Sequence, residues 1–338
     1  MGYILYFIMT INRSPNSTIS DKAFSAPEIS IPHNRWSRLI LPFGLVGLLF
    51  LFAIDPGCRV AQGDPPTIQI QEDEHGRRLV IDHRLKAYAD TLTWESNLKY
   101  TAVAGLPIHF FSIPGRLLLM GLGAGSIAKA YRKERWSVDA AEPDSGVIAV
   151  ARRSFGLREE DAVVYQVDPR QFLGSHPDRY DLILEDMVSA RSIPPHLMTA
   201  EFFGLVGAHL REGGVFGISF ECAGWNDPVV ASIAATLNAR FRSVVVFPIA
   251  EPPNRFGAIL VVASDAQHEE LARDVDRNEG LSPEWRFGPE YQRTHAWDNR
   301  FAPDVRRATA QFDTRNTLDR MFRTENDSAG AQPGDYTP

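Results

Sequence analysis

Cysteine is almost absent from this chain of 338 residues, which contains only Cys58 and Cys222. Two cysteines cannot form a disulfide framework, or a zinc cluster built from cysteine ligands, within one chain. A basic excess is also lacking, because the formal net charge is -7. Proteins that bind nucleic acid over a broad surface normally carry a positive excess, so we expect a small-molecule partner and no nucleic acid.

The composition is that of a globular protein, with 44% hydrophobic and 23% charged residues. It predicts one large or two modest domains around a sizeable buried core. The predicted segments are a disordered leader (1–34), a signal sequence or membrane anchor (35–56), an N-terminal β-hairpin module (67–112), a Rossmann-like ligand-binding domain (113–265), and a C-terminal extension with a disordered tail (266–338).

An uncharged hydrophobic stretch covers residues 39–54. It follows Arg35 and Arg38 and precedes Asp55, which is the arrangement of a signal sequence or signal anchor. The stretch is about 16 residues long, slightly short of the roughly 20 residues that usually span a bilayer. Two interpretations stay open. The protein is membrane-associated or exported through this segment, or it is cytoplasmic and the leader is not used.

From residue 116 onward, short hydrophobic runs alternate with helical patterns, which is typical of βαβ units and a parallel sheet. Seven such runs lie at residues 117–120, 137–141, 163–167, 181–185, 215–220, 243–248 and 257–263. The connection between the last two is too short for a crossover helix, so these two strands are expected to pair antiparallel. The sequence predicts an α/β fold with a Rossmann-like, seven-stranded sheet of the methyltransferase type. A β-hairpin with strands at 67–71 and 77–82 precedes it.

Two predicted helices have recognisable ends. Thr199 is expected to cap a helix over 200–210, which the pair Gly213 and Gly214 is expected to close. Asp227, followed by a proline, is expected to begin the next helix.

A glycine-rich turn follows the first strand of the predicted sheet. It contains Gly121, Gly123 and Gly125, and Ser126 comes next. Such a turn lets the backbone approach a ligand at a helix N-terminus, where unpaired N–H groups favour polar or anionic groups. The Gly-x-Gly-x-Gly spacing differs from the dinucleotide pattern and so disfavours NAD. The alternative is a tight turn that binds no ligand.

Carboxylates follow the next three strands of the predicted sheet. Glu142 comes after the second strand, Asp168 after the third and Asp186 after the fourth, at the edge where α/β sheets bind ligands. Glu142 could accept ribose hydroxyls, or it could be a solvated turn residue. Asp168 could bind an adenine amino group, or it could cap the helix that follows it.

The stretch from 116 to 220 resembles the spermidine synthase family, the polyamine aminopropyltransferases, and especially their divergent bacterial relatives attached to membrane segments. The matching pieces lie at residues 121–126, 141–144, 168–172, 180–186 and 193–203. With the N-terminal hairpin, the resemblance covers roughly residues 67 to 265.

This resemblance implies that the domain binds an S-adenosyl compound. The glycine turn (Gly121, Gly123 and Gly125) and Glu142 would hold S-adenosylmethionine or its decarboxylated form as a co-substrate, without a metal. Asp168 would read the adenine. Asp186 would be the catalytic aspartate that orients the amine or polyamine acceptor and helps to remove its proton.

The chain also departs from the family pattern on the acceptor side. Spermidine synthases place a second aspartate where this chain has Ser189, Arg191 adds positive charge nearby, and Lys86 replaces the usual glutamine. A diammonium substrate would lose an ion pair, so the acceptor need not be putrescine. His196 is interpreted as a loop or helix-start residue and not as a base.

Two other functions stay open at this point. One is an S-adenosylmethionine-dependent methyltransferase with the same fold, and the other is a catalytically inactive, membrane-attached binding protein. A homodimer is also left open.

Overall fold

The computed structural model describes residues 67–74, 76–81, 84–96, 98–186, 194–249, 253–266 and 288–318. All of them belong to one compact unit, residues 63–338. The predicted leader, the hydrophobic stretch 39–54 and the positions Ser189 and Arg191 lie outside the described residues. Within the described ranges, no helix combines the length and the apolar character needed to cross a bilayer.

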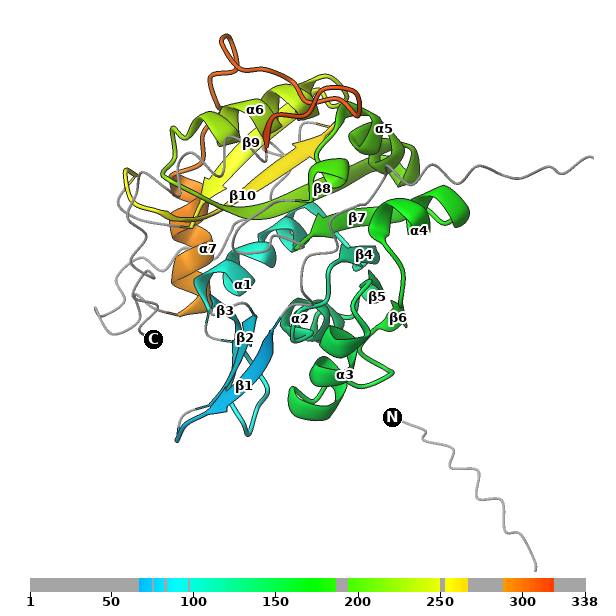
Figure 1. Ribbon diagram of the computed structural model, residues 1–338, viewed down its shortest axis with the longest axis vertical. Helices are drawn as coiled ribbons and strands as arrows, with labels where there is room; N and C mark the ends of the chain where they lie inside the picture. Colours follow the sequence, from blue (N-terminus) through cyan, green and yellow to red (C-terminus); the bar gives the residue numbers. More distant parts are fainter. Residues whose placement is uncertain are drawn as a thin grey trace, which may run out of the picture. The chain divides into compact units, whose positions relative to one another are not determined.

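One sheet of seven strands organises the structure, in the order β6-β5-β4-β7-β8-β10-β9 (Figure 1). The strands are β4 (Arg116–Met120), β5 (Ser137–Ala141), β6 (Val163–Tyr165), β7 (Tyr180–Glu185), β8 (Leu210–Cys222), β9 (Ser243–Pro248) and β10 (Gly257–Ser264). The first five in sequence are parallel, and β10 runs antiparallel to β8 and β9. This confirms the predicted α/β fold and the antiparallel pairing of the last two strands.

Helices cover both faces of the sheet (Figure 1). The helices are α1 (Lys99–Ala104), α2 (Ser126–Lys133), α3 (Ser145–Ser154), α4 (Pro169–Ser175), α5 (Ala200–His209), α6 (Pro228–Asn238) and α7 (Pro289–Asp298), with 3-10 turns η1 (Leu106–Phe110) and η2 (Pro195–Leu197). Residues of α4, α5 and α6 pack on one face, and residues of α1, α2, α3 and α7 on the other. Burial on both faces explains why the central strands are continuous hydrophobic runs.

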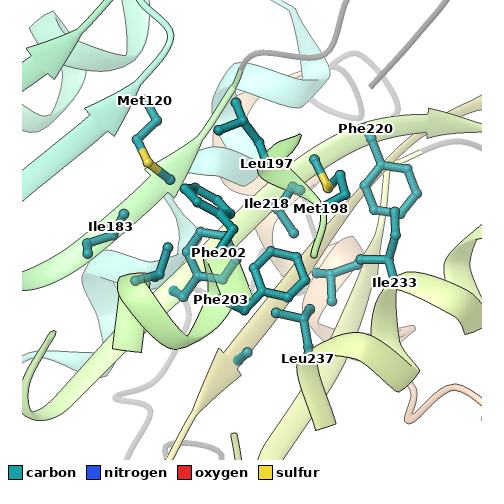
Figure 2. Packing of buried hydrophobic residues seen from close by; sticks show 14 of the residues in the cluster. Met120, Ile183, Leu197, Met198, Phe202, Phe203, Ile218, Phe220, Ile233 and Leu237 are labelled. Carbon is teal, nitrogen blue, oxygen red and sulfur yellow. The ribbon is translucent and has the colours of Figure 1, made fainter. Parts of the chain in front are cut away.

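The core under α5 and α6 is rich in aromatic and branched side chains. Figure 2 shows Phe202 and Phe203 of α5 between the sheet and the α6 residues Ile233 and Leu237. All four side chains are 0% exposed. Burying a large apolar side chain contributes roughly 1.5–3 kcal/mol, so this layer holds α5 and α6 firmly against the sheet.

The predicted helix starts are confirmed, and one predicted helix end is wrong. Thr199 accepts a hydrogen bond from the Phe202 N–H at 3.2 Å, and Asp227 accepts one from the Val229 N–H at 2.7 Å. However, α5 ends at His209, and the Gly213–Gly214 pair lies inside β8. Gly213 has φ = +71°, and the pairing of β7 with β8 shifts register in this region, so these glycines form an irregularity in the strand and do not close the helix.

The N-terminal module contains one strand more than the sequence predicts. The strands β1 (Ile68–Glu72), β2 (Arg77–Ile81) and β3 (Arg84–Ala89) form an antiparallel sheet. Leu79 and Ala87 of this sheet pack in one cluster with Ala124 of the glycine turn. The module therefore lies against the turn that follows β4.

Candidate functional site

The glycine turn joins β4 to α2 in a conformation that favours glycine. Gly121, Gly123 and Gly125 have φ values of +93°, +51° and +77°. Hydrogen bonds from Gly121 N–H to the Ala141 carbonyl (2.9 Å) and from Gly125 N–H to the Leu122 carbonyl (2.8 Å) fix the turn. The turn thus brings backbone N–H groups and the N-terminus of α2 to the end of β4, as the sequence predicts.

Backbone hydrogen bonds place two of the predicted carboxylates at the same edge of the sheet. Glu142 follows β5 and donates its N–H to the Tyr165 carbonyl of β6 at 3.0 Å. Asp186 follows β7 and donates its N–H to the Met120 carbonyl of β4 at 2.8 Å. Both residues therefore lie beside the glycine turn.

The Glu142 side chain is tied to this turn. It is 7% exposed, and its Oε2 accepts a hydrogen bond from the Leu122 N–H at 3.0 Å while its Oε1 accepts one from the Asp144 N–H at 2.9 Å. Burial raises the pKa of the Glu142 carboxyl, and these two backbone bonds oppose the shift. An ionised carboxylate can accept about four hydrogen bonds, so each oxygen can still accept one from a hydroxyl group.

Asp168 is the N-cap of α4, which is the alternative role predicted for it. Its Oδ1 accepts hydrogen bonds from the N–H groups of Arg170 (2.9 Å) and Gln171 (3.1 Å). Its Oδ2 lies 2.8 Å from Nε2 of His196, in the 3-10 turn η2. Both carboxylate oxygens of Asp168 therefore already have protein partners.

Asp186 is half-buried among charged groups from other elements. Burial raises the pKa of its carboxyl to about 7; the Lys86 ammonium lowers the pKa and the Glu142 carboxylate raises it. Lys86 lies on β3, so the N-terminal module brings a cation near Asp186. A carboxyl with a pKa close to the working pH is suited to take up and release a proton.

The sequence interpretation missed Glu185, the last residue of β7. This side chain is 1% exposed, and among the described residues neither of its oxygens has a hydrogen-bond partner. Burial raises the pKa of its carboxyl well above the usual value, and the Asp168 and Asp186 carboxylates raise it further. The available signal was a glutamate inside a hydrophobic run, a residue type that is almost never fully buried without a partner.

The described residues also form a cavity, which the predicted site residues do not line. A cavity of about 550 Å³ is lined by Glu74, between β1 and β2, and by residues of β3, α1 and α7 and of the segment between β3 and α1, among them Tyr88, Asp90, Lys99 and Gln292. None of the predicted site residues lines it. In the described part of the chain, no group of three or more histidine, cysteine, aspartate or glutamate side chains is arranged to hold a metal.

The sheet order, the glycine turn and the acidic groups at the edge define a Rossmann-like protein of the methyltransferase type. Over 200 residues, the chain is 25% identical to polyamine aminopropyltransferase 1 of Aquifex aeolicus, a match that covers 56% of this chain and 68% of that protein. Over 154 residues, it is 26% identical to the polyamine aminopropyltransferase of Streptococcus uberis, a match that covers 43% of this chain and 52% of that protein. The chain thus spans about half the length of the Streptococcus uberis relative. No family model matches the chain.

A solved structure shares the fold. The chain is similar to a probable spermidine synthase from Corynebacterium glutamicum, with a TM-score of 0.57 and 18% identity over 75% of this chain and 95% of that one. The matches to named aminopropyltransferases and the shared fold support the resemblance to the spermidine synthase family. The narrower placement in a membrane-associated branch stays a prediction.

Proposed function

We propose that this chain is a spermidine synthase-like transferase that moves an alkyl group from an S-adenosyl donor to an amine. The observation that carries the proposal is the hydrogen bond between Glu142 and the Leu122 N–H, because it joins the predicted ribose acceptor to the glycine turn. Asp186 follows the neighbouring strand β7, where an acceptor amine would meet the donor. The similarity to polyamine aminopropyltransferases supports the same reaction class.

The donor would lie across the ends of β4, β5 and β6. The N–H groups of the glycine turn would face its polar tail, and the remaining lone pairs of Glu142 would accept the ribose hydroxyls. Decarboxylated S-adenosylmethionine and S-adenosylmethionine share the nucleoside that these groups contact. The residues of the turn and Glu142 therefore suit either donor.

The reaction would be a single displacement at carbon. The Asp186 carboxylate takes a proton from the ammonium group of the acceptor, which frees the lone pair of the nitrogen. The lone pair attacks the carbon next to the donor sulfonium, the carbon–sulfur bond breaks, and its electron pair stays on sulfur. The thioether nucleoside leaves, and the product nitrogen carries the positive charge that the sulfonium has lost. With the decarboxylated donor, the group transferred is aminopropyl and the product is methylthioadenosine.

The acceptor side supports an amine other than a simple diamine. Lys86 lies near Asp186 and adds positive charge where a second ammonium group of the acceptor would otherwise bind. A like charge at a binding site repels such a substrate. We therefore place putrescine below amines that carry fewer positive charges as the acceptor.

The test is product analysis with the purified full chain. Decarboxylated S-adenosylmethionine is supplied with putrescine, spermidine or a monoamine, and methylthioadenosine is measured. Release that depends on the amine and is lost in Asp186→Asn supports the proposal. S-adenosylhomocysteine formed from S-adenosylmethionine would indicate a methyltransferase instead. Tight nucleoside binding, unchanged in Asp186→Asn and without turnover of either donor, would indicate an inactive binding protein. Absence of any S-adenosyl binding by calorimetry would reject the whole proposal.

A further inference from the structure

Glu185 is a buried carboxyl group that the proposed reaction does not use. It ends β7 and is 1% exposed. In the described part of the chain, neither Oε1 nor Oε2 has a hydrogen-bond partner. An unpaired buried polar group costs about 1–3 kcal/mol, and few native structures retain one without a reason.

The strand pairing shows which groups surround this carboxyl. Glu185 pairs with Met120 on β4 and with Ile218 on β8. Figure 2 shows Met120 and Ile218, with Ile183 two residues before Glu185, on the sheet face that Phe202 covers. Side chains alternate along a strand, so Glu185 shares the face of Ile183, and Asp186 is directed to the opposite face.

The carboxylates of Asp168 and then of Asp186 act on Glu185 and raise the pKa of its carboxyl. An isolated ionised carboxylate in apolar surroundings is very costly, so the group holds its proton instead. Glu185 is therefore a neutral acid, with one O–H donor and one C=O acceptor side by side.

Asp168, the predicted reader of adenine, contrasts with Glu185. Its Oδ1 caps α4, and its Oδ2 is paired with His196. An adenine amino group would have to share these oxygens with their present partners. The carboxyl group of Glu185 is close enough to Asp168 to be affected by its charge, and within the described ranges neither of its oxygens has a hydrogen-bond partner.

We propose that Glu185 reads the nucleobase of the bound nucleoside by pairing with the edge of adenine. Its O–H donates to ring nitrogen N1, and its C=O accepts from the 6-amino group. The neutral carboxyl group thus forms two parallel hydrogen bonds with this edge of adenine, which presents one acceptor and one donor. This inference rests on the proposed function, because it requires an S-adenosyl nucleoside at the sheet edge. Since Glu185 is 1% exposed, nucleoside binding must also shift the side chains that cover the end of β7.

The test pairs a change in the ligand with a change in the protein. The probes are 5′-methylthioadenosine and its analogue without the 6-amino group, and binding to the full chain is measured by calorimetry. The variants are Glu185→Leu, which removes both hydrogen-bonding groups, and Glu185→Gln, which keeps a donor and an acceptor. The matched control is Asp181→Asn, on the same strand but held by Arg116 and Arg211 at the opposite end of the sheet.

If Glu185 pairs with adenine, the loss in affinity on removing the 6-amino group should depend on Glu185. In the wild type and in Asp181→Asn, loss of the amino group weakens binding roughly tenfold, which is the effect of one hydrogen bond of about 1.4 kcal/mol. Glu185→Leu binds 5′-methylthioadenosine at least tenfold more weakly and no longer distinguishes the two probes. Glu185→Gln keeps the discrimination.

Three results would overturn the inference. Unchanged affinity and discrimination in Glu185→Leu, with the wild type binding well, would show that Glu185 does not read the base and would leave the proposed function intact. Weakened polyamine binding alone in this variant would assign Glu185 to the acceptor. A wild type that binds neither probe would reject the proposed function and the inference together. Thermal unfolding of Glu185→Leu at or above the wild-type midpoint confirms that it is folded.

Discussion

Oε2 of Glu142 accepts a hydrogen bond from the Leu122 N–H at 3.0 Å, and this contact links the end of β5 to the glycine turn after β4. The other carboxylate oxygen, Oε1, accepts a hydrogen bond from the Asp144 N–H at 2.9 Å. One side chain thus fixes two backbone segments at the edge of the sheet, and each of its oxygens can accept a second hydrogen bond.

Glu142→Gln is expected to weaken both nucleoside binding and the fold. The glutamine NH₂ group would face one of the two backbone N–H donors, which leaves a buried donor unpaired and costs about 1–3 kcal/mol of stability. Binding of 5′-methylthioadenosine should fall roughly tenfold or more, because a ribose hydroxyl loses a charged acceptor. Calorimetry and thermal unfolding check both effects. Affinity equal to that of the wild type would contradict the assignment of Glu142.

Alanine substitutions in the glycine turn should separate backbone strain from ligand contact. Among the described residues, a Cβ at Gly123 would meet nothing within 4 Å, whereas one at Gly125 would lie 2.8 Å from Cδ1 of Leu157. Both residues have positive φ, so each alanine costs about 1–2 kcal/mol in the backbone, and Gly125→Ala costs more because Leu157 must move.

The order of these two variants in nucleoside affinity should differ from their order in stability. Gly123→Ala places a methyl group in open space at the turn where the proposed nucleoside would bind, so it should weaken binding of 5′-methylthioadenosine despite its smaller effect on the unfolding midpoint. Gly204→Ala is the matched control, because it lies in α5, also has open space around its Cβ and should leave binding unchanged. Full affinity in Gly123→Ala would argue against a ligand at this turn.

The sheet could be predicted from sequence because its strands are buried on both faces. Leu117 and Leu119 pack into the core on one side, and Leu118 and Met120 into the core on the other, so the whole run is apolar. The strand β3 escaped prediction because Ala87 and Ala89 carry its buried face, and alanine has a low strand propensity. The Gly213–Gly214 pair was misread because a glycine pair after a helical pattern is typical of a helix end.

The site could be predicted only in part. A carboxylate directly after a strand must lie at the sheet edge, which places Glu142 and Asp186 without further information. The pairing of Asp168 with His196 joins residues from separate segments, and no local pattern specifies it. The isolation of Glu185 depends on Met120 and Ile218 beside it, which only the strand order and register reveal.

Asp313 ties the C-terminal extension to the starts of α4 and α5. Its carboxylate forms two hydrogen bonds with Arg170, at 2.8 and 2.5 Å, and accepts one from Thr199 at 2.7 Å. These contacts hold the pKa of Asp313 at about 2, below its usual value, with the Arg170 hydrogen bond as the main cause. The contribution of Asp313 to stability is therefore present above about pH 4 and is lost as the pH falls towards 2.

Asp313→Asn should lower stability by about 1 kcal/mol at neutral pH, since the pair is partly exposed. The difference from the wild type should shrink as the pH falls below 4. Asp304→Asn is the matched control, because Asp304 also has a pKa of about 2 but pairs with Arg306, two residues along the chain. Denaturant unfolding at pH 3 and pH 7 measures both variants. Equal effects of the two substitutions would show that Asp313 does not join separate elements.

The last prediction concerns the pH dependence set by Asp186 and Lys86. In the proposed reaction Asp186 must be ionised to accept the proton of the acceptor amine, and its pKa is about 7. The rate of methylthioadenosine release should therefore rise with pH, and the acid limb of the pH–rate profile should have its midpoint near pH 7. Lys86 lowers this pKa, so Lys86→Met should move the limb to higher pH and reduce the rate most at low pH. Lys99→Met, which removes a lysine on α1 that lines the separate cavity, is the matched control and should leave the limb in place. An acid limb that stays at the same pH in Lys86→Met would show that Lys86 does not act on the Asp186 carboxyl.

The same carboxyl should also affect stability. Since the Asp186 pKa is raised in the folded state, its ionisation destabilises the fold as the pH rises from about 4 through 7, and Asp186→Asn should remove this slope from the unfolding midpoint.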